Sequence, residues 1–463
     1  MRITFIVSLV FLATIALSSV VDIEISPSVS GEKSLVDFSG NVRSYLIAGD
    51  MYSFSLVLTF NEKPNSAVVD LSMPKNAELF INGKSLGSHG VFHVDMSKVK
   101  FTPFSIRYEI SFQLAKKSEG TENVLLEIKV KDDRGKILSQ EMKIPFKLGP
   151  VKRMICENSK CVLKALENAK PGYLIELKPG IYIGRIGEKN GKSAYFYIPV
   201  SGEKDLPIIV RSLDSSSPAI LQGETVEKGY GLYITGDNVI IENLIVRNAQ
   251  KGIVLDNANW NVLKGCEVYE IGDEGIHVRD GSSHNLITEC WIHDTGKRKG
   301  RKGYGEGIYI GSAWKTVKKH EYYPVCSYNV VRENKIGPEV TAEHLDIKEF
   351  TLGTLIENNV FYGKGISGEH YADSFIDLKG NTAIVRWNIF YRQNNSKIKD
   401  AVQVHDVVKN GDWGYGNVIY GNVFFMDTEN GYMVNAPTGS VRVYENTRIP
   451  EGENYKGKFK REE

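Results

Sequence analysis

The 463-residue chain carries almost no net charge and few cysteines. Its 57 basic and 56 acidic residues leave a formal charge of +1, so bulk attraction to nucleic acid is absent and no nucleic-acid partner is expected. The five cysteines show no zinc-binding spacing. Gln is sparse while Lys and Glu are common, which favours a thermophilic source.

Long apolar runs are absent except at the N-terminus. Residues 1–20 contain one basic residue, then an apolar run of about fifteen residues, then small residues, which predicts a secretory signal peptide. The alternative is an uncleaved anchor, although a membrane span needs about 20 apolar residues. We therefore expect a secreted or cell-surface protein, a monomer without further membrane contact.

Two cysteines lie close together in the segment CENSKC. In an exported protein, Cys156 and Cys161 predict a local disulfide, whereas Cys326 has no evident partner. The following residues predict a short amphipathic helix, because Val162, Leu163 and Leu166 share one helical face. Such a helix could shield the end of a stacked β structure.

Residues 21–150 alternate apolar and polar side chains at a period of two, as in YSFSLVLTF and SIRYEISFQL. Several such strands with short turns predict an immunoglobulin-like β-sandwich, an accessory domain without a catalytic constellation. Gly149-Pro150 marks its predicted end. Residues 151–455 then form the predicted catalytic or binding domain.

A repeat in this second region determines the predicted fold. Segments such as VVRENKIG, LIENNVFY and VIYGNVFF share an apolar run, a polar pair, an Asn or Cys, and an apolar pair. The shared position holds Asn243, Cys266, Cys290, Asn334, Asn359, Asn388 and Asn422. A second strand precedes each segment, so stacked coils of a parallel β-helix with an internal Asn ladder are expected. Cys266 and Cys290 are interpreted as small buried residues, with a disulfide as the alternative.

The first strands of successive coils can be aligned by their apolar residues. Their outward residues then form one column, Tyr233, Val254, His277, Tyr309, Asp346, Asp377 and Gln403. A second column contains Thr235, Asp256, Arg279, Gly311, Lys348, Lys379 and His405. Neighbouring coils lie about 4.8 Å apart, so Asp346 should stack on Asp377, and Lys348 on Lys379. Like charges opposite one another are unfavourable, so their repetition indicates a site rather than an ordinary polar surface.

The repeat resembles the pectate-lyase-like right-handed parallel β-helix superfamily across roughly residues 155–450. The paired Asp with a G-H-G segment of galacturonan hydrolases is absent, as is the Asp-Pro-His-Asp segment of alginate epimerases. The nearest analogy is with enzymes of the chondroitinase-B and alginate-lyase type. That analogy implies Lys348 as a catalytic residue with Asp346 and Glu343 as acidic neighbours. The arginine of those enzymes has no match, since Arg279 lies on the opposite side of the lysine in chain order.

Acidic uronate polysaccharides can be cleaved by β-elimination, which suits this set of side chains. A base removes the C5 proton, an acid protonates the leaving oxygen, and a cation neutralises the sugar carboxylate. We assign Lys348 as the base with Lys379 second, and Arg279 as the carboxylate clamp. Candidate acids or bases are His405, His277 and Tyr309. Candidate Ca²⁺ ligands are Asp346, Asp377, Glu343 and Asp373.

Several further residues are candidates for substrate binding. The insertion at 295–307 is basic and includes Arg298 and Arg301, which could hold a polyanion or could be a solvated loop. The other candidates are Gln403, Trp314, Tyr371 and Trp413. The sequence thus predicts a secreted polysaccharide lyase. A glycoside hydrolase using Asp346 and Asp377, or a non-catalytic carbohydrate-binding protein, are the alternatives on the same fold.

Overall fold

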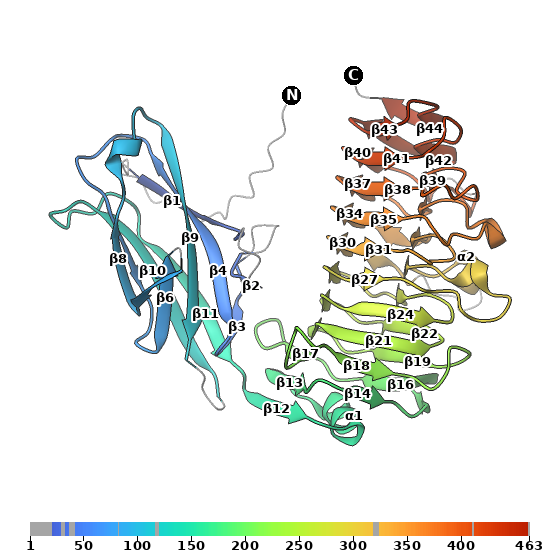
Figure 1. The fold of residues 1–463 in the computed structure, drawn as a ribbon, viewed down its shortest axis with the longest axis horizontal. Coiled ribbons are helices and arrows are strands. Elements are labelled where there is room, and N and C mark those ends of the chain that lie inside the picture. The colour runs from blue at the N-terminus through green and yellow to red at the C-terminus, as the bar shows by residue number, and fades with distance from the viewer. Residues whose placement is uncertain are drawn as a thin grey trace. The chain divides into compact units, whose positions relative to one another are not determined.

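The computed structural model describes residues 21–28, 33–36, 42–81, 83–115, 120–317, 324–409 and 412–461. The predicted signal peptide, residues 1–20, lies outside them. The chain divides into two compact units, Met1–Arg153 and Met154–Glu463 (Figure 1). Among the helices of the described ranges, none is both long and apolar enough to span a membrane.

The first unit contains two sheets that are mainly antiparallel and enclose one core. One sheet has the order β1 (Val21–Ser26), β4 (Met51–Phe60), β9 (Phe104–Leu114), β6 (Ala77–Ile81) and β7 (Lys84–Gly87), with β2 (Lys33–Ser34) beside β4. The other has the order β3 (Tyr45–Ile47), β11 (Met142–Gly149), β10 (Glu122–Lys131), β5 (Val68–Ser72) and β8 (His89–His93). Alternate residues of β4 and β9, such as Phe54 and Phe112, meet between the sheets, as a β-sandwich requires.

The second unit is a parallel β-helix, whose coils stack from α1 to the C-terminal end in Figure 1. The first strand of each coil is β16 (Lys192–Ile198), β19 (Tyr230–Ile234), β22 (Lys251–Asp256), β25 (Ile276–Arg279), β28 (Ile308–Ile310), β32 (Leu345–Ile347), β36 (Ile376–Leu378), β39 (Val402–Val404) and β42 (Val434–Tyr444). The second is β13 (Tyr173–Leu177), β17 (Ile208–Ser212), β20 (Val239–Glu242), β23 (Val262–Lys264), β26 (Leu286–Thr288), β30 (Val330–Arg332), β34 (Leu355–Glu357), β37 (Ile384–Arg386) and β40 (Asn417–Tyr420).

The third strands form a separate ten-stranded sheet. They are β14 (Ile181–Ile183), β18 (Ala219–Gln222), β21 (Leu244–Ala249), β24 (Glu267–Ile271), β27 (Trp291–Ile292), β31 (Lys335–Ile336), β35 (Val360–Tyr362), β38 (Ile389–Tyr391), β41 (Val423–Phe425) and β43 (Thr447–Ile449). The remaining strands are β12 (Lys152–Cys156), β15 (Gly187–Lys189), β29 (Cys326–Ser327), β33 (Thr351–Leu352) and β44 (Tyr455–Arg461). Short helices are α2 (Trp314–Val317), η1 (Met96–Lys98), η2 (Lys302–Tyr304) and η3 (Glu369–Tyr371).

The predicted register of the first strands is confirmed. Leu345 pairs with Ile376, and Ile347 with Leu378, and all four side chains are fully buried in the β-helix core. Alternation at a period of two therefore places the intervening residues on the outer face of the coil. Asp346 lies between Leu345 and Ile347 and pairs in register with Asp377.

The predicted Asn ladder is present, but it begins later in the chain than expected. Asn334, Asn359, Asn388 and Asn422 each accept a hydrogen bond from the preceding coil at 2.9–3.0 Å, and the ladder continues to Asn446. The assignment of Asn243 to this position is wrong. Glu242 pairs with Lys264, so Asn243 faces Gly265, and Leu244 occupies the position of Cys266. The error is one residue, because Asn243 adopts a left-handed turn conformation immediately before the ladder position.

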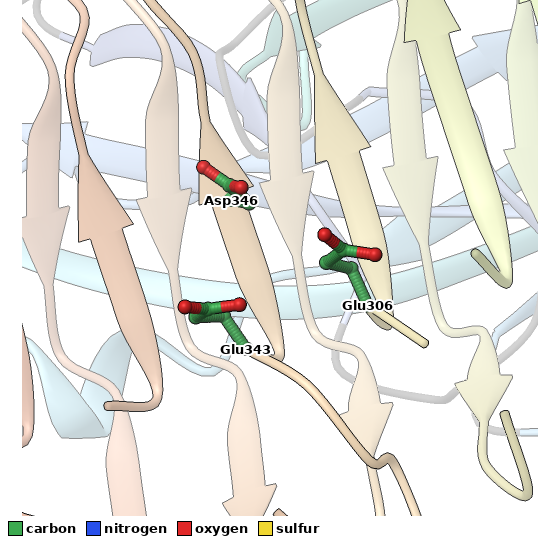
Figure 2. A group of neighbouring side chains, drawn as sticks. All are labelled: Glu306, Glu343 and Asp346. Carbon is green, nitrogen blue, oxygen red and sulfur yellow. The ribbon is translucent and has the colours of Figure 1, made fainter. Parts of the chain in front are cut away.

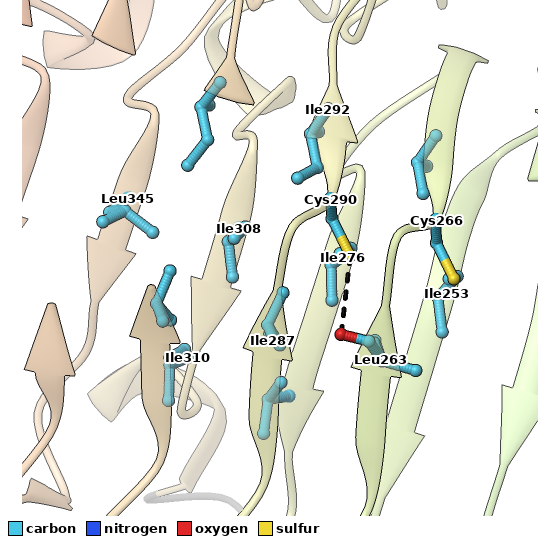
Figure 3. Close-up of a cluster of buried hydrophobic side chains, with 14 of the residues drawn as sticks. Ile253, Leu263, Cys266, Ile276, Ile287, Cys290, Ile292, Ile308, Ile310 and Leu345 are labelled. Atoms are coloured by element: carbon cyan, nitrogen blue, oxygen red, sulfur yellow. Dashed lines mark hydrogen bonds between the residues drawn. The ribbon is translucent and has the colours of Figure 1, made fainter. Parts of the chain in front are cut away.

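Cys266 and Cys290 take the ladder position in the two preceding coils and are free, buried thiols (Figure 3). The Cys290 Sγ lies 3.5 Å from the carbonyl oxygen of Leu263, whereas the Asn334 amide donates to the carbonyl of Ile287 one coil later. A thiol is a weak donor and can replace the amide at this position. The interpretation of Cys266 and Cys290 as small buried residues is therefore confirmed. Cys326 is also free and buried.

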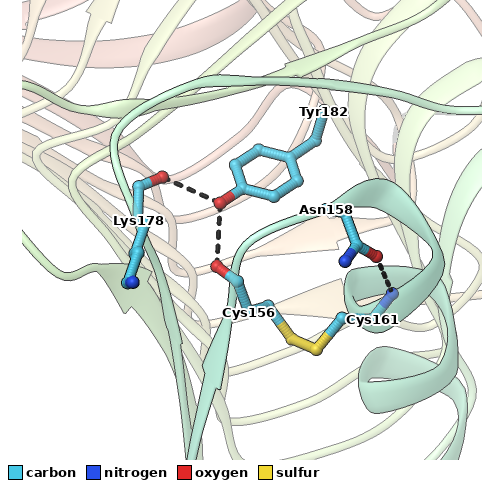
Figure 4. The surroundings of a disulfide bond; sticks show 5 residues. All are labelled: Cys156, Asn158, Cys161, Lys178 and Tyr182. Atoms are coloured by element: carbon cyan, nitrogen blue, oxygen red, sulfur yellow. Dashed lines mark hydrogen bonds between the residues drawn. A yellow bond between two sulfur atoms is a disulfide. The ribbon is translucent and has the colours of Figure 1, made fainter.

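Helix α1 (Ser159–Asn168) lies at the start of the β-helix (Figures 1 and 4). Asn158 caps it, accepting a hydrogen bond from the Cys161 amide at 3.0 Å, and the predicted Cys156–Cys161 disulfide ties it to β12. Val162 and Leu166 are buried against the first coils, as expected from their shared face, while Leu163 is only partly buried. The helix covers a sheet end that would otherwise expose apolar side chains.

Candidate active site

The outer column of the first strands gathers charged residues from distant parts of the sequence. Tyr309 of β28 pairs with Asp346 of β32, and Asp346 with Asp377 of β36. These outward residues are not on an open surface, since Asp346 is 2% exposed and Asp377 is 7% exposed. Because buried charges need partners, their environment must supply compensating groups.

Lysines provide that compensation. The Lys379 Nζ lies 2.8 Å from Asp346 Oδ1 and 2.5 Å from Asp377 Oδ2, so it bridges the two carboxylates. The Lys348 Nζ lies 2.5 Å from the other oxygen of Asp346. The expectation that like charges stack directly on one another therefore holds for the strand register but not for the charged ends. The charged ends of long side chains can alternate in sign even where the backbone positions repeat the same residue type.

The carboxylates determine the protonation of these lysines. Burial lowers the pKa of Lys348, but the charge and hydrogen bond of Asp346 outweigh it, so the pKa lies above its ordinary value. The pKa of Lys379 is also raised, by Asp346 and Asp377 against burial. Conversely, burial raises the pKa of Asp377, but Lys379 and His405 outweigh it and hold that pKa well below its usual range. For Lys379, the two carboxylates also outweigh the like charge of Lys348, which lowers the pKa.

Three carboxyl groups converge beside this network (Figure 2). Glu306, Glu343 and Asp346 are buried, and one oxygen from each lies within 4.8 Å of the others. The Glu306 Oε2 is buried without a hydrogen-bond partner. Burial, together with Glu274 and Asp346, raises the pKa of Glu306 to about 8, and burial raises the pKa of Glu343 well above its usual range.

Glu306 was missed as a candidate, although a signal for it exists in the sequence. It lies two residues before the first apolar residue of β28, as Glu274 does before β25 and Glu343 before β32. The amide of Gly275 binds the Glu306 carbonyl, and that of Gly307 binds the Glu343 carbonyl, so the three occupy equivalent positions in successive coils. Extending the column alignment by two residues would have found it.

The predicted metal ligands do not form one group. Glu343 and Asp346 lie together, but Asp377 is engaged by Lys379 and His405. Asp373 lies in another cluster, where it accepts hydrogen bonds from Gln403 at 2.9 Å and Lys399 at 2.7 Å. Asp373 precedes its strand by three residues rather than two, which turns its side chain toward the following coil.

The remaining catalytic candidates flank the lysines. His405 Nδ1 lies 2.9 Å from Asp377 Oδ1, and its side chain is 26% exposed. His277 is buried beneath the Tyr309 ring, with ring centroids 4.5 Å apart. Arg279 belongs to an earlier coil and donates to Asp256 at 2.6 Å, so this predicted carboxylate clamp is already bound to a carboxylate.

The predicted substrate-binding residues differ in how far they are available. Arg298 pairs with Asp273 at 2.7 Å, and the Arg301 guanidinium lies 3.5 Å from the centre of the Tyr304 ring. Trp314 and Trp413 both pack against Phe350, at 5.8 and 4.8 Å between ring centroids. Gln403 is held by Asp373 and Asp400. Tyr371, at 88% exposed, is the most open of the six.

Comparison with known proteins places these coils in a family. A model described as "Right handed beta helix region" matches residues 210–321. Among curated proteins, none matches the chain. An alginate lyase from Paenibacillus sp. str. FPU-7 is 43% identical, with a TM-score of 0.62, and the match covers 66% of this chain and 98% of that one.

Two other solved structures are similar at low identity. The PL6 family alginate lyase AlyGC is 15% identical with a TM-score of 0.43, covering 64% of this chain and 40% of that one. A family 28 exopolygalacturonase of Yersinia enterocolitica is 12% identical with a TM-score of 0.39, covering 88% and 96%. Together with the stacked coils and the Asn ladder, the 43% identical match shows that the chain belongs to the pectate-lyase-like right-handed parallel β-helix superfamily.

Proposed function

We propose that the chain is a secreted polysaccharide lyase that cleaves a uronate-containing polysaccharide by β-elimination. The observation that carries the proposal is the contact between Lys348 and Tyr309, which lie on adjacent coils, with the Lys348 Nζ 4.9 Å from the centre of the tyrosine ring. The similarity to an alginate lyase makes alginate the first substrate to test. Secretion is supported by the signal pattern of residues 1–20.

Lys348 and Tyr309 would divide the two proton transfers of the elimination. Tyr309 would be the acid because its ring faces Lys348, and burial and then Asp346 raise its pKa well above the ordinary value, so the hydroxyl carries its proton before the reaction. Lys348 would remove the C5 proton, and its side chain remains 15% exposed at the site. Since Asp346 holds Lys348 as an ammonium, only a small fraction is deprotonated near neutral pH. We therefore expect kcat/KM to rise with pH over the neutral range.

Neutralisation of the sugar carboxylate has two candidate sources. Lys379 is a buried cation that bridges Asp346 and Asp377. Glu306, Glu343 and Asp346 also fit a Ca²⁺ ion, because they bring together hard oxygen donors and one of them, Glu306 Oε2, has no partner. A bound Ca²⁺ would supply positive charge for the carboxylate of the substrate.

A glycoside hydrolase is the second candidate, and one observation favours it. Such enzymes pair a protonated carboxyl with an ionised one, and Glu306, with a pKa of about 8, lies close to Asp346. The pair Asp346 and Asp377 is less suitable, since Lys379 forms an ion pair with each of them. A non-catalytic carbohydrate-binding protein is the third.

The chemistry of the products distinguishes these functions. The purified protein is incubated with alginate, pectate, glucuronan and a glycosaminoglycan, with and without EDTA. A lyase produces unsaturated uronate ends that absorb in the ultraviolet, and this is the expected result on alginate. New reducing ends without that absorbance would identify a hydrolase, and retention on immobilised substrate without cleavage a binding protein. Loss of activity in EDTA that Ca²⁺ restores would support the cation site.

A further inference from the structure

A second buried polar cluster consists of Lys251, Glu274 and His277. It lies on the coils that precede Tyr309, whereas Lys348 lies on the coil that follows it. The Lys251 Nζ of β22 lies 2.7 Å from Glu274 Oε1 and 3.0 Å from His277 Nδ1. Glu274 and His277 are 8% and 6% exposed, and the Lys251 side chain is 14% exposed. Burial and the charge of Lys251 lower the pKa of His277 to about 4, so the imidazole is neutral.

The contacts determine which nitrogen of His277 carries the proton. The Nδ1 lies 3.0 Å from the Lys251 ammonium and 3.4 Å from a Glu274 carboxylate oxygen, and acceptance from the ammonium assigns the hydrogen to Nε2. The Nε2 lies 3.3 Å from the carbonyl oxygen of Gly311 and donates to it. Both nitrogens are therefore used inside the protein, and His277 has none left for substrate.

His277 contacts the proposed acid, Tyr309, and also Gly311, which lies against the proposed base, Lys348. Its ring packs against the Tyr309 ring at 4.5 Å and 56°. Gly311 has a φ of +97°, and a Cβ there would lie 3.0 Å from the Lys348 Cβ, so this turn lies directly against the lysine side chain. Movement of the Gly311 carbonyl would thus shift the support of Lys348.

We propose that Lys251, Glu274 and His277 form a positioning triad that holds Tyr309 and, through the Gly311 turn, Lys348 in their reactive arrangement. His277 acts through its neighbours and touches no substrate. The inference rests on the proposed lyase function. It replaces the sequence-based assignment of His277 as an acid or base, since that assignment required a free ring nitrogen.

Three substitutions of His277 separate its two hydrogen bonds. His277→Leu removes both, His277→Asn keeps an amide near the position of Nδ1, and His277→Gln keeps an amide that can reach the Gly311 carbonyl. We expect His277→Leu to lower kcat on alginate by about 100-fold with little change in KM, because misplacement by about 1 Å has that effect. His277→Gln should recover at least about tenfold of the loss, and His277→Asn less.

A matched control is His344→Gln. His344 is also fully buried and uses Nε2 to bind one carbonyl, that of Tyr362 at 3.0 Å, but it faces the aromatic core beside Phe361 and Phe375. Its replacement should lower the melting temperature and leave kcat of the folded protein unchanged. The double variant Lys251→Met/Glu274→Gln removes both charges together and should lower kcat about tenfold, which tests the triad if His277→Leu does not fold.

The outcomes separate the triad from the function on which it rests. Unchanged kcat in folded His277→Leu, or equal kcat in His277→Gln and His277→Leu, would overturn the triad while the lyase stands. A change confined to KM would also overturn it. Absence of unsaturated products from the unaltered protein would overturn the proposed function and the triad with it.

Discussion

At the scale of single residues, buried charge is the main feature of the site. Asp346 is almost completely enclosed, yet it contacts two lysines and approaches two glutamates. Such a network is stable only where every charge has a partner. The Glu306 and Glu343 carboxyls have the least compensation, and their raised pKa values are the consequence.

Lys348→Arg tests whether this lysine removes a proton or only holds a carboxylate. Arginine keeps the positive charge but does not deprotonate in proteins. We expect kcat on alginate to fall by about 10²–10⁴-fold, the usual contribution of a general base. Lys178→Arg, which changes a lysine paired with Glu157 far from the site, is the control. Near-normal turnover by Lys348→Arg would assign the lysine to carboxylate binding.

His344 should make stability depend on pH. Burial lowers its pKa from 6.5 to about 3, so the folded state excludes a proton that the unfolded chain accepts. This contribution is fully present above pH 6.5 and is lost as the pH falls toward 3, by up to about 1.4 kcal/mol per pH unit. Urea unfolding at pH 7, 5.5 and 4 should show a shallower decline for His344→Gln. Parallel declines in the two proteins would contradict the assignment.

At the scale of elements, the Asn ladder connects the coils. The Asn388 amide donates to Ile356 and Asn422, and its oxygen accepts from the backbone and side chain of Asn359. Removing one rung leaves several buried groups without partners, whereas the last rung, Asn446, is only partly buried. The ladder should therefore be most sensitive at its centre.

Asn388→Ala is expected to reduce the free energy of unfolding by about 2 kcal/mol or more, since each buried group left unsatisfied costs about 1–3 kcal/mol. Asn446→Ala should cost less, and denaturant unfolding measures the difference. Equal losses at the two positions would argue against a cooperative ladder.

At the scale of the whole molecule, two hydrophobic cores are separate. One lies within the β-sandwich and the other within the β-helix, and every candidate catalytic residue lies in the second unit, Met154–Glu463. A domain with its own core can fold alone. We therefore expect the proposed chemistry to proceed without the β-sandwich.

A fragment beginning at Val151 keeps β12, the Cys156–Cys161 disulfide and α1. We expect it to fold, as circular dichroism would show, and to retain the activity of the full chain on soluble alginate within about twofold. A fragment that folds but loses most of that activity would indicate a catalytic contribution from residues 21–150.

The sequence by itself determined the β-helix, the column of outward residues and the pairing of Asp346 with Asp377. These follow from periods in the chain, two residues along a strand and one coil along the repeat, and short periods can be read directly. Only the tertiary structure decided which side chains meet. Long side chains such as Lys251 and Lys379 reach across neighbouring coils, so their partners do not follow from the register alone. Protonation was decided there too, because burial and nearby charge depend on position in space.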